Sequence, residues 1–125
     1  MAATIKQGSL AQEFYTPERC YITELSNSAD DPQLSIARAR VAPGVTTCWH
    51  LLKQSEERYC IISGTGMVEI GTLAAQQVGT GDVVVIPARC RQRITNIGED
   101  DLLFLAICTP RFRVDDYQNL ETDMA

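Results

Sequence analysis

The chain has 125 residues, of which 45% are hydrophobic and 22% charged, and its formal net charge at pH 7 is −5. This length fits one domain, and the composition is typical of a globular protein rather than a disordered or fibrous one. Because an acidic surface does not attract polyanions, nucleic acid and anionic membranes are poor partners, and we expect a small molecule or another protein instead.

The ends and the cysteines indicate where the protein works. The first ten residues lack a basic region followed by an apolar run, and no stretch is long enough to cross a membrane, so we expect a cytoplasmic protein. The five cysteines are Cys20, Cys48, Cys60, Cys90 and Cys108. Their number is odd and they contain no C-x-x-C pair, so free thiols are expected in a chain of this size.

In chain order, many short strands are predicted. Residues 1–17 are mixed and mildly polar, and we interpret them as an N-terminal arm. Strands are predicted at 20–25, 34–41, 46–52, 58–63, 67–70, 75–78, 83–86, 92–96 and 102–108, with Gly or Asp in nearly every gap. Short strands at regular spacing, without a long helical period, predict an all-β antiparallel barrel or sandwich.

We expect a single domain over residues 1–125, with its core at about 20–110. The C-terminal tail, 111–125, is acidic and is expected to be anchored by Phe112 and Tyr117, with its last residues frayed.

The only histidine, His50, marks the candidate site. Side chains alternate across a strand, so His50 shares a face with Cys48 and Leu52, while Glu57 shares a face with Tyr59 on the next predicted strand. Nitrogen and oxygen donors that converge from neighbouring strands build divalent-metal sites in β scaffolds. The pattern therefore indicates a metal site or a polar pocket.

Two Gly-punctuated stretches resemble the two motifs of the cupin superfamily, which run from Gly through His-x-His and Glu to Gly, and from Gly through Pro to His and Asn. The matching positions are Gly44, His50, Glu57 and Gly64 in the first motif and Gly81, Pro87 and Asn96 in the second. Leu52, Arg89 and Gln92 depart from the motifs, because they stand where relatives have histidine, glycine and histidine. The resemblance covers roughly residues 35–110.

The resemblance implies a double-stranded β-helix, the cupin-like jelly-roll barrel, with a divalent metal ion (Zn, Mn, Fe or Ni) held by His50, Glu57 and Gln92. It also implies a homodimer in which the arm packs over the partner subunit. Most relatives bring three imidazoles to the metal, whereas this chain has one.

Each site residue has an alternative interpretation. His50 is otherwise a core histidine bonded to a Glu or a backbone carbonyl, and Gln92 a hydrogen-bonding glutamine on the barrel wall. Glu56 competes with Glu57, because a one-residue slip exchanges the faces of a strand. Tyr59, Cys48 and Cys90 are pocket candidates, although buried cysteines more often simply pack. Arg89, Arg91 and Arg93 are either a basic patch beside the pocket mouth or an exposed strand face.

The expected function is redox-neutral chemistry on a small molecule, of the isomerase, cyclase or decarboxylase type, with the metal as Lewis acid. One alternative is a binding protein without metal or catalysis. Others are a thiol-dependent enzyme and an oxygenase, but oxygenases use two histidines and one carboxylate, which this chain does not supply.

Overall fold

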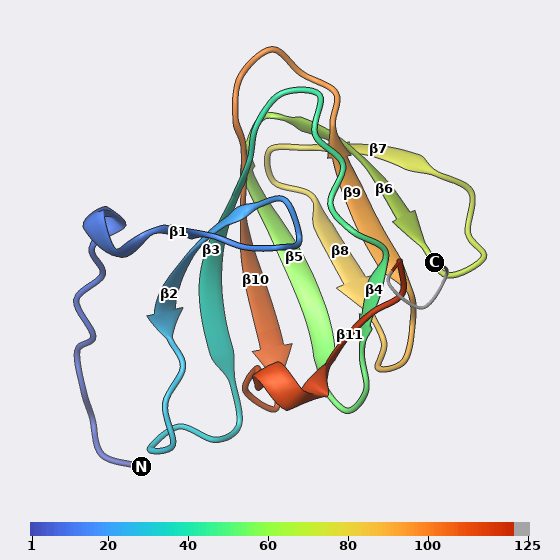
Figure 1. The fold of residues 1–125 in the computed structure, drawn as a ribbon. Helices are drawn as coiled ribbons and strands as arrows, with labels where there is room; N and C mark the ends of the chain where they lie inside the picture. The colour runs from blue at the N-terminus through green and yellow to red at the C-terminus, as the bar shows by residue number, and fades with distance from the viewer. Residues whose placement is uncertain (122–125) are drawn as a thin grey trace.

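Two β-sheets face each other in the computed structural model, which describes residues 1–121 (Figure 1). One sheet has the strand order β1-β2-β3-β10-β5-β8 and the other β11-β4-β9-β6-β7. The strands are β1 (Phe14–Tyr15), β2 (Tyr21–Ser26), β3 (Ser35–Val41), β4 (His50–Leu52), β5 (Glu56–Ser63), β6 (Thr65–Ile70), β7 (Gln76–Gly79), β8 (Val83–Ile86), β9 (Gln92–Asn96), β10 (Leu102–Thr109) and β11 (Tyr117–Asn119).

The expected all-β jelly roll is confirmed. The helical elements among residues 1–121 are two single 3-10 turns, Leu10–Gln12 and Val114–Asp116. Neither approaches the length and hydrophobicity that a membrane-spanning helix needs. All pairings between named strands are antiparallel.

The period of two in the sequence determines which side chains enter the core. In β5, Glu57, Tyr59 and Ile61 point inward and are buried, whereas Glu56 and Ile62 are exposed. The inner faces of both sheets meet in one apolar cluster, which includes Val41, Tyr59, Ile61, Val68, Ile86, Ile94, Leu102 and Phe104. Polar residues buried beside this cluster are therefore held in place by packing as well as by hydrogen bonds.

The predicted strand 46–52 is shorter in the structure, where β4 covers only its last three residues. Thr47 N donates to Ile94 O, but Cys48 N donates to Glu18 O, which belongs to the loop before β2. The backbone therefore changes its hydrogen-bond partner from Ile94 to Glu18 between Thr47 and Cys48, and residues 46–52 do not form one continuous strand.

Both ends of the chain contain strands that the pattern did not predict. In the arm, β1 pairs with β2 of its own chain, and the homodimer stays a prediction. In the tail, β11 pairs with β4 and aligns Asn119 with His50. Asp116 supports this pairing, because its carboxylate accepts hydrogen bonds from Gln54 N and Ser55 N at 2.8 and 3.1 Å. Residues 122–125, where fraying was expected, lie outside the described part of the chain.

Candidate functional site

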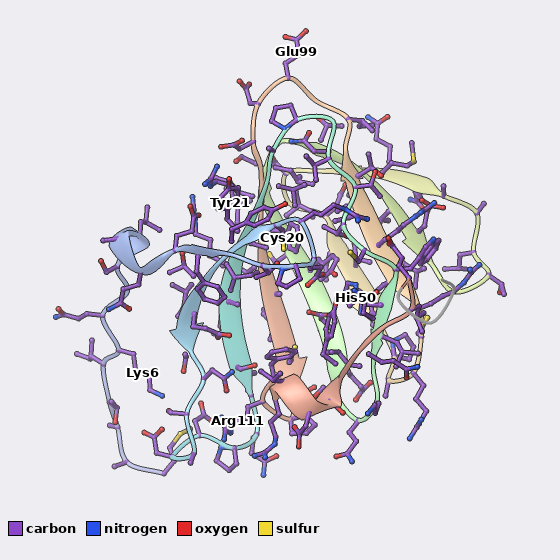
Figure 2. All side chains as sticks on the ribbon, viewed as in Figure 1. Lys6, Cys20, Tyr21, His50, Glu99 and Arg111 are labelled. Atoms are coloured by element: carbon purple, nitrogen blue, oxygen red, sulfur yellow. The ribbon has the colours of Figure 1, made fainter. Side chains whose placement is uncertain are left out.

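Two adjoining cavities lie inside the protein. We call them the inner cavity, of about 50 Å³, and the outer cleft, of about 400 Å³. Six residues line both: Glu18, Ile22, Glu57, Ala106, Phe112 and Tyr117. His50 lines only the inner cavity, and Figure 2 shows it between the two sheets. A molecule in the outer cleft would therefore reach His50 past Glu18 and Glu57.

His50 is held at both ring nitrogens. Its Nδ1 lies 2.7 Å from Cys48 O, and its Nε2 lies 3.3 Å from Glu18 Oε1. The ring stacks on Tyr117 with 5.1 Å between centroids, and only 3% of the residue is exposed. Since a carbonyl only accepts, Nδ1 carries a proton, and the Nε2 lone pair of the neutral ring faces Glu18. This arrangement matches the alternative of a histidine bonded to a Glu and a backbone carbonyl.

Glu57, and not Glu56, points into the interior. Glu57 is 8% exposed, and Glu56 on the same strand is exposed. The Oε2 atom of Glu57 lies 3.7 Å from Cys108 Sγ, while Oε1 is buried without a hydrogen-bond partner. An unpartnered buried carboxyl oxygen is costly, and the residue that carries it lines both cavities.

The surroundings shift the pKa values of Glu57, Glu18 and His50. Burial raises the pKa of Glu57 to about 7, opposed by the attraction of His50 and assisted by the negative charge of Glu18. Burial also raises the pKa of Glu18 to about 7, although 21% of its side chain stays exposed. Burial lowers the pKa of His50. Near neutral pH the imidazole is thus neutral, and each carboxyl is able to hold or release a proton.

Gln92 lies opposite His50 in the β4–β9 pairing and is 1% exposed. Its side-chain oxygen, the expected metal ligand, accepts a hydrogen bond from the Tyr59 hydroxyl. Within residues 1–121, no three His, Cys, Asp or Glu side chains are grouped so that they would hold a metal ion. The metal site of His50, Glu57 and Gln92 therefore stays a prediction.

Comparison with known proteins decides the family. The family model described as "Cupin domain" matches residues 37–108. The chain belongs to the cupin domain family. A relative in Methanocaldococcus jannaschii, the uncharacterized protein MJ1618, is 30% identical over 116 residues, which are 93% of this cupin and 85% of the relative.

Solved structures share this fold at low sequence identity. The Streptomyces nucleoside dehydratase Pac13 is 17% identical, with a TM-score of 0.75, and the match covers 93% of this cupin and 91% of Pac13. An oxalate decarboxylase of Lactobacillus farciminis, solved as a formate complex, is 22% identical with a TM-score of 0.77. That match covers 90% of this cupin but 34% of the decarboxylase. At these identities, the similarity shows the fold alone.

Several expected site residues lie elsewhere in this cupin. Tyr59 lines the inner cavity, but Cys48 and Cys90 line neither cavity. The Cys48 thiol is turned toward Pro17 O at 3.5 Å, because residues 46–49 leave the regular strand geometry that would have placed it beside His50. Cys90 lies in the loop before β9, where strand alternation does not apply. These two pocket assignments are corrected.

The three arginines, for which a basic patch and an exposed strand face were both open, lie away from the two cavities. Arg91 and Arg93 stack on the Trp49 ring, with 4.5 and 4.3 Å from guanidinium carbon to ring centroid, and Arg93 pairs with Glu69 at 2.8 Å. Arg89, like the other two, lines neither cavity. Arg91 and Arg93 therefore pack on Trp49, the residue before β4, and not on His50.

Sequence reasoning missed Glu18, the partner of His50. Glu18 lies in the loop between β1 and β2, and its carbonyl accepts Cys48 N at 3.2 Å. The next residue, Arg19, has a φ of 72° and donates through Nε to Thr46 O at 2.8 Å. Only the folded loop brings Glu18 to His50, so no strand periodicity could have found it.

Proposed function

We propose that this cupin binds a small molecule in the outer cleft and moves protons on it, in a redox-neutral isomerisation or elimination. Three neighbouring groups would do this: Glu18, His50 and Glu57. The observation that carries the proposal is the unpartnered Glu57 Oε1, buried beside an imidazole whose Nε2 faces Glu18.

The chemistry follows from the protonation of the three groups. A general acid or base works best when its pKa is close to the working pH, and burial raises the pKa of both Glu57 and Glu18 to about 7. His50 is neutral and held by Cys48 O, so its Nε2 is able to take a proton from one carboxyl while the other gives or takes one at the ligand. Every step is a proton transfer, and no oxidant is needed.

The apolar side chains around the site also support proton transfer to a bound small molecule. Ile22, Ala106 and Phe112 line both cavities, and these side chains would exclude water from a ligand next to Glu57. Without water, each proton transfer is directed to the ligand, and the charges that form are stabilised by few, fixed groups. A protein of the same fold, Pac13, is a nucleoside dehydratase, which supports proton chemistry as one use of this scaffold.

A metal-dependent function fits the side-chain donors less well. The expected third ligand, Gln92, already accepts the Tyr59 hydroxyl, and Nε2 of His50 faces Glu18. The donors as they lie do not form a three-ligand site, so we route no step through a metal ion. The unpartnered Glu57 Oε1 is the one feature in favour of a cation at this position.

Ligand-observed NMR with a panel of neutral, cationic and anionic small molecules tests the proposal. Compounds that bind are then incubated with the protein in deuterated water, and deuterium incorporation at carbon is followed. The native chain and a Glu56→Gln control are expected to promote exchange, while His50→Gln and Glu57→Gln lose it by at least about a hundredfold. Binding without exchange in the native chain would contradict proton transfer and favour the non-catalytic alternative.

A further inference from the structure

Among residues 1–121, the walls of the two cavities carry acidic side chains but no lysine or arginine, and burial lowers the pKa of their one histidine, His50. Glu18 and Glu57 line both cavities, and Glu24 lines the outer cleft. None of the lining residues, all of which belong to the described part of the chain, is a Lys or an Arg. A ligand carboxylate or phosphate would therefore meet like charges and find no cationic partner.

Most of the remaining wall of the outer cleft is apolar or aromatic, with Thr16, Ser35 and Asn119 as further polar residues. Its lining includes Phe14, Phe112, Val114 and the ring of Tyr117. Such walls favour an apolar body, and aromatic faces attract cations through the negative charge on the ring surface. Acidic and aromatic walls together recognise a cation that has a hydrophobic body.

Two polar atoms of these walls lack partners. Glu57 Oε1 and the Tyr117 hydroxyl are both buried without a hydrogen-bond partner, and Glu57 is only 8% exposed. The hydroxyl is able to donate or accept, whereas the ionised carboxylate only accepts. A ligand that donates N–H groups would satisfy the carboxylate, and a ligand that only accepts would not.

We propose that the ligand of this cupin is an organic ammonium ion with an apolar or aromatic body, whose N–H groups donate to Glu57 and Glu18 while the body fills the outer cleft. The proposal rests on the proposed function, because it names the ligand class of the same site.

The affinity for such a cation should depend on pH. The titratable groups that face the two carboxyls are His50, Glu24, Tyr59, Tyr117, Cys20 and Cys108. Burial lowers the pKa of His50 and raises that of Cys20 to about 12, so neither group supplies a competing charge at neutral pH. As the pH rises and Glu57 and Glu18 ionise, the attraction for an ammonium ion increases, because protonated carboxyls carry no charge.

Three indole compounds of similar size separate charge from shape: tryptamine (a cation), tryptophol (neutral) and indole-3-acetate (an anion). Their dissociation constants are measured by calorimetry on the full chain with EDTA present, at about pH 5 and about pH 8. We expect tryptamine to bind at least about tenfold more tightly at the higher pH. Tryptophol should show little pH dependence, and indole-3-acetate should bind most weakly of the three.

Glu57→Gln is the main variant, because it keeps the shape and hydrogen-bonding capacity of the side chain but removes the charge. It should weaken tryptamine binding at about pH 8 by at least about tenfold and leave tryptophol unaffected. Glu56→Gln, the exposed neighbour on the same strand, is the matched control and should leave all three affinities unchanged.

The proposal is overturned if tryptophol or indole-3-acetate binds as tightly as tryptamine at about pH 8, or if Glu57→Gln keeps the preference for the cation. Failure to bind any of the three compounds also overturns it. The proposed function fails on a different result. It is contradicted when no compound of any charge in the NMR panel exchanges protons with deuterated water in the presence of the native chain. Neutral or anionic binders that do exchange would preserve that function and reject the ammonium ligand.

Discussion

The Tyr59 hydroxyl donates a hydrogen bond to the side-chain oxygen of Gln92, and this bond crosses from β5 in one sheet to β9 in the other. Both residues are buried, at 3% and 1% exposure. The bond therefore connects the two sheets at the wall of the inner cavity, which Tyr59 lines, in surroundings where an unmade hydrogen bond is costly.

Removing one partner of this bond should cost more than removing both. Tyr59→Phe leaves the Gln92 oxygen buried without a donor, which should lower the free energy of unfolding by about 1–3 kcal/mol. In the double variant Tyr59→Phe/Gln92→Leu neither group needs a partner, so part of that loss should be recovered. Urea unfolding followed by fluorescence of the single tryptophan measures both values. A double variant that is no more stable than Tyr59→Phe would contradict the coupling.

The buried Glu57 should make the protein less stable as the pH rises. Its pKa is raised from 4.5 to about 7 in the folded protein, so the folded state holds the proton more tightly than the unfolded state. Stability is therefore lost as the pH rises through this window, by at most about 3 kcal/mol.

Glu57→Gln stays neutral and should remove this slope, and its stability relative to the native chain should increase from about pH 5 to about pH 8. The pKa of Glu18 is also raised to about 7, so the variant and the native chain are compared at each pH. The exposed Glu56→Gln should show no such difference. Parallel pH profiles for the native chain and Glu57→Gln would show that folding does not raise the pKa of Glu57.

The site residues whose interior position the sequence predicts lie on regular strands. His50 and Glu57 lie on β4 and β5, where alternation separates inward from outward side chains, and this alternation assigns the interior to Glu57. For the same reason β8 and β9 have the predicted bounds, since uninterrupted periodic runs flanked by turn residues determine where a strand starts and ends.

The site residues that the sequence does not predict lie in segments without an alternating hydrophobic pattern. Glu18 reaches His50 through a loop that needs a left-handed φ at Arg19, a residue type that does not signal one. Tyr117 covers His50 from β11, a strand of three residues that is too short to show alternation. These positions depend on tertiary contacts, such as the two backbone hydrogen bonds that Asp116 accepts, and not on local sequence preference.

Leu52→His should create a stronger metal site. Leu52 and His50 both line the inner cavity, so the variant would offer two imidazoles next to the Glu57 carboxylate. Its affinity for Zn²⁺, measured by competition with a chromogenic chelator, should exceed that of the native chain by at least about tenfold. Leu51→His, on the opposite face of β4, is the control and should show no gain.

The native chain provides the test of the metal site that the sequence predicts. Metal content is measured in protein purified without an affinity tag and in His50→Ala. Stoichiometric metal that disappears in His50→Ala would establish ligation at His50 and reject the metal-independent mechanism. Content far below one ion per chain in both proteins is the result we expect from the hydrogen bond that occupies Gln92.

The cysteines should separate into two classes of reactivity. Cys20, Cys48 and Cys108 are buried, and burial raises the pKa of each thiol. Since the thiolate is the nucleophile, these three should resist iodoacetamide in the folded protein, while the half-buried Cys60 and Cys90 react first. Mass spectrometry after timed labelling locates the modified residues. Fast labelling of Cys48 would contradict the prediction and support a thiol-dependent mechanism beside His50.

Two motif glycines should respond differently to the same substitution. Gly64 has a φ of +94°, and a Cβ there would lie 2.8 Å from Asp101 O and 2.9 Å from Leu102 Cα. Gly44 has a φ of +78° but open space around its Cβ position. Both alanine variants bear the cost of a left-handed backbone, about 1–2 kcal/mol, whereas Gly64→Ala must also displace the main chain leading into β10.

We therefore expect Gly64→Ala to lose at least about 3 kcal/mol of unfolding free energy and Gly44→Ala about 1 kcal/mol. Cys108 of β10 lies opposite Glu57 of β5, so a displacement that passes along β10 from its start would also move Glu57. Gly64→Ala should thus weaken tryptamine binding as well as stability, and Gly44→Ala only stability. Equal losses of stability in the two variants would contradict this prediction. They would show that the main chain before β10 moves at no cost in free energy, and that only the left-handed backbone requires glycine at the two positions.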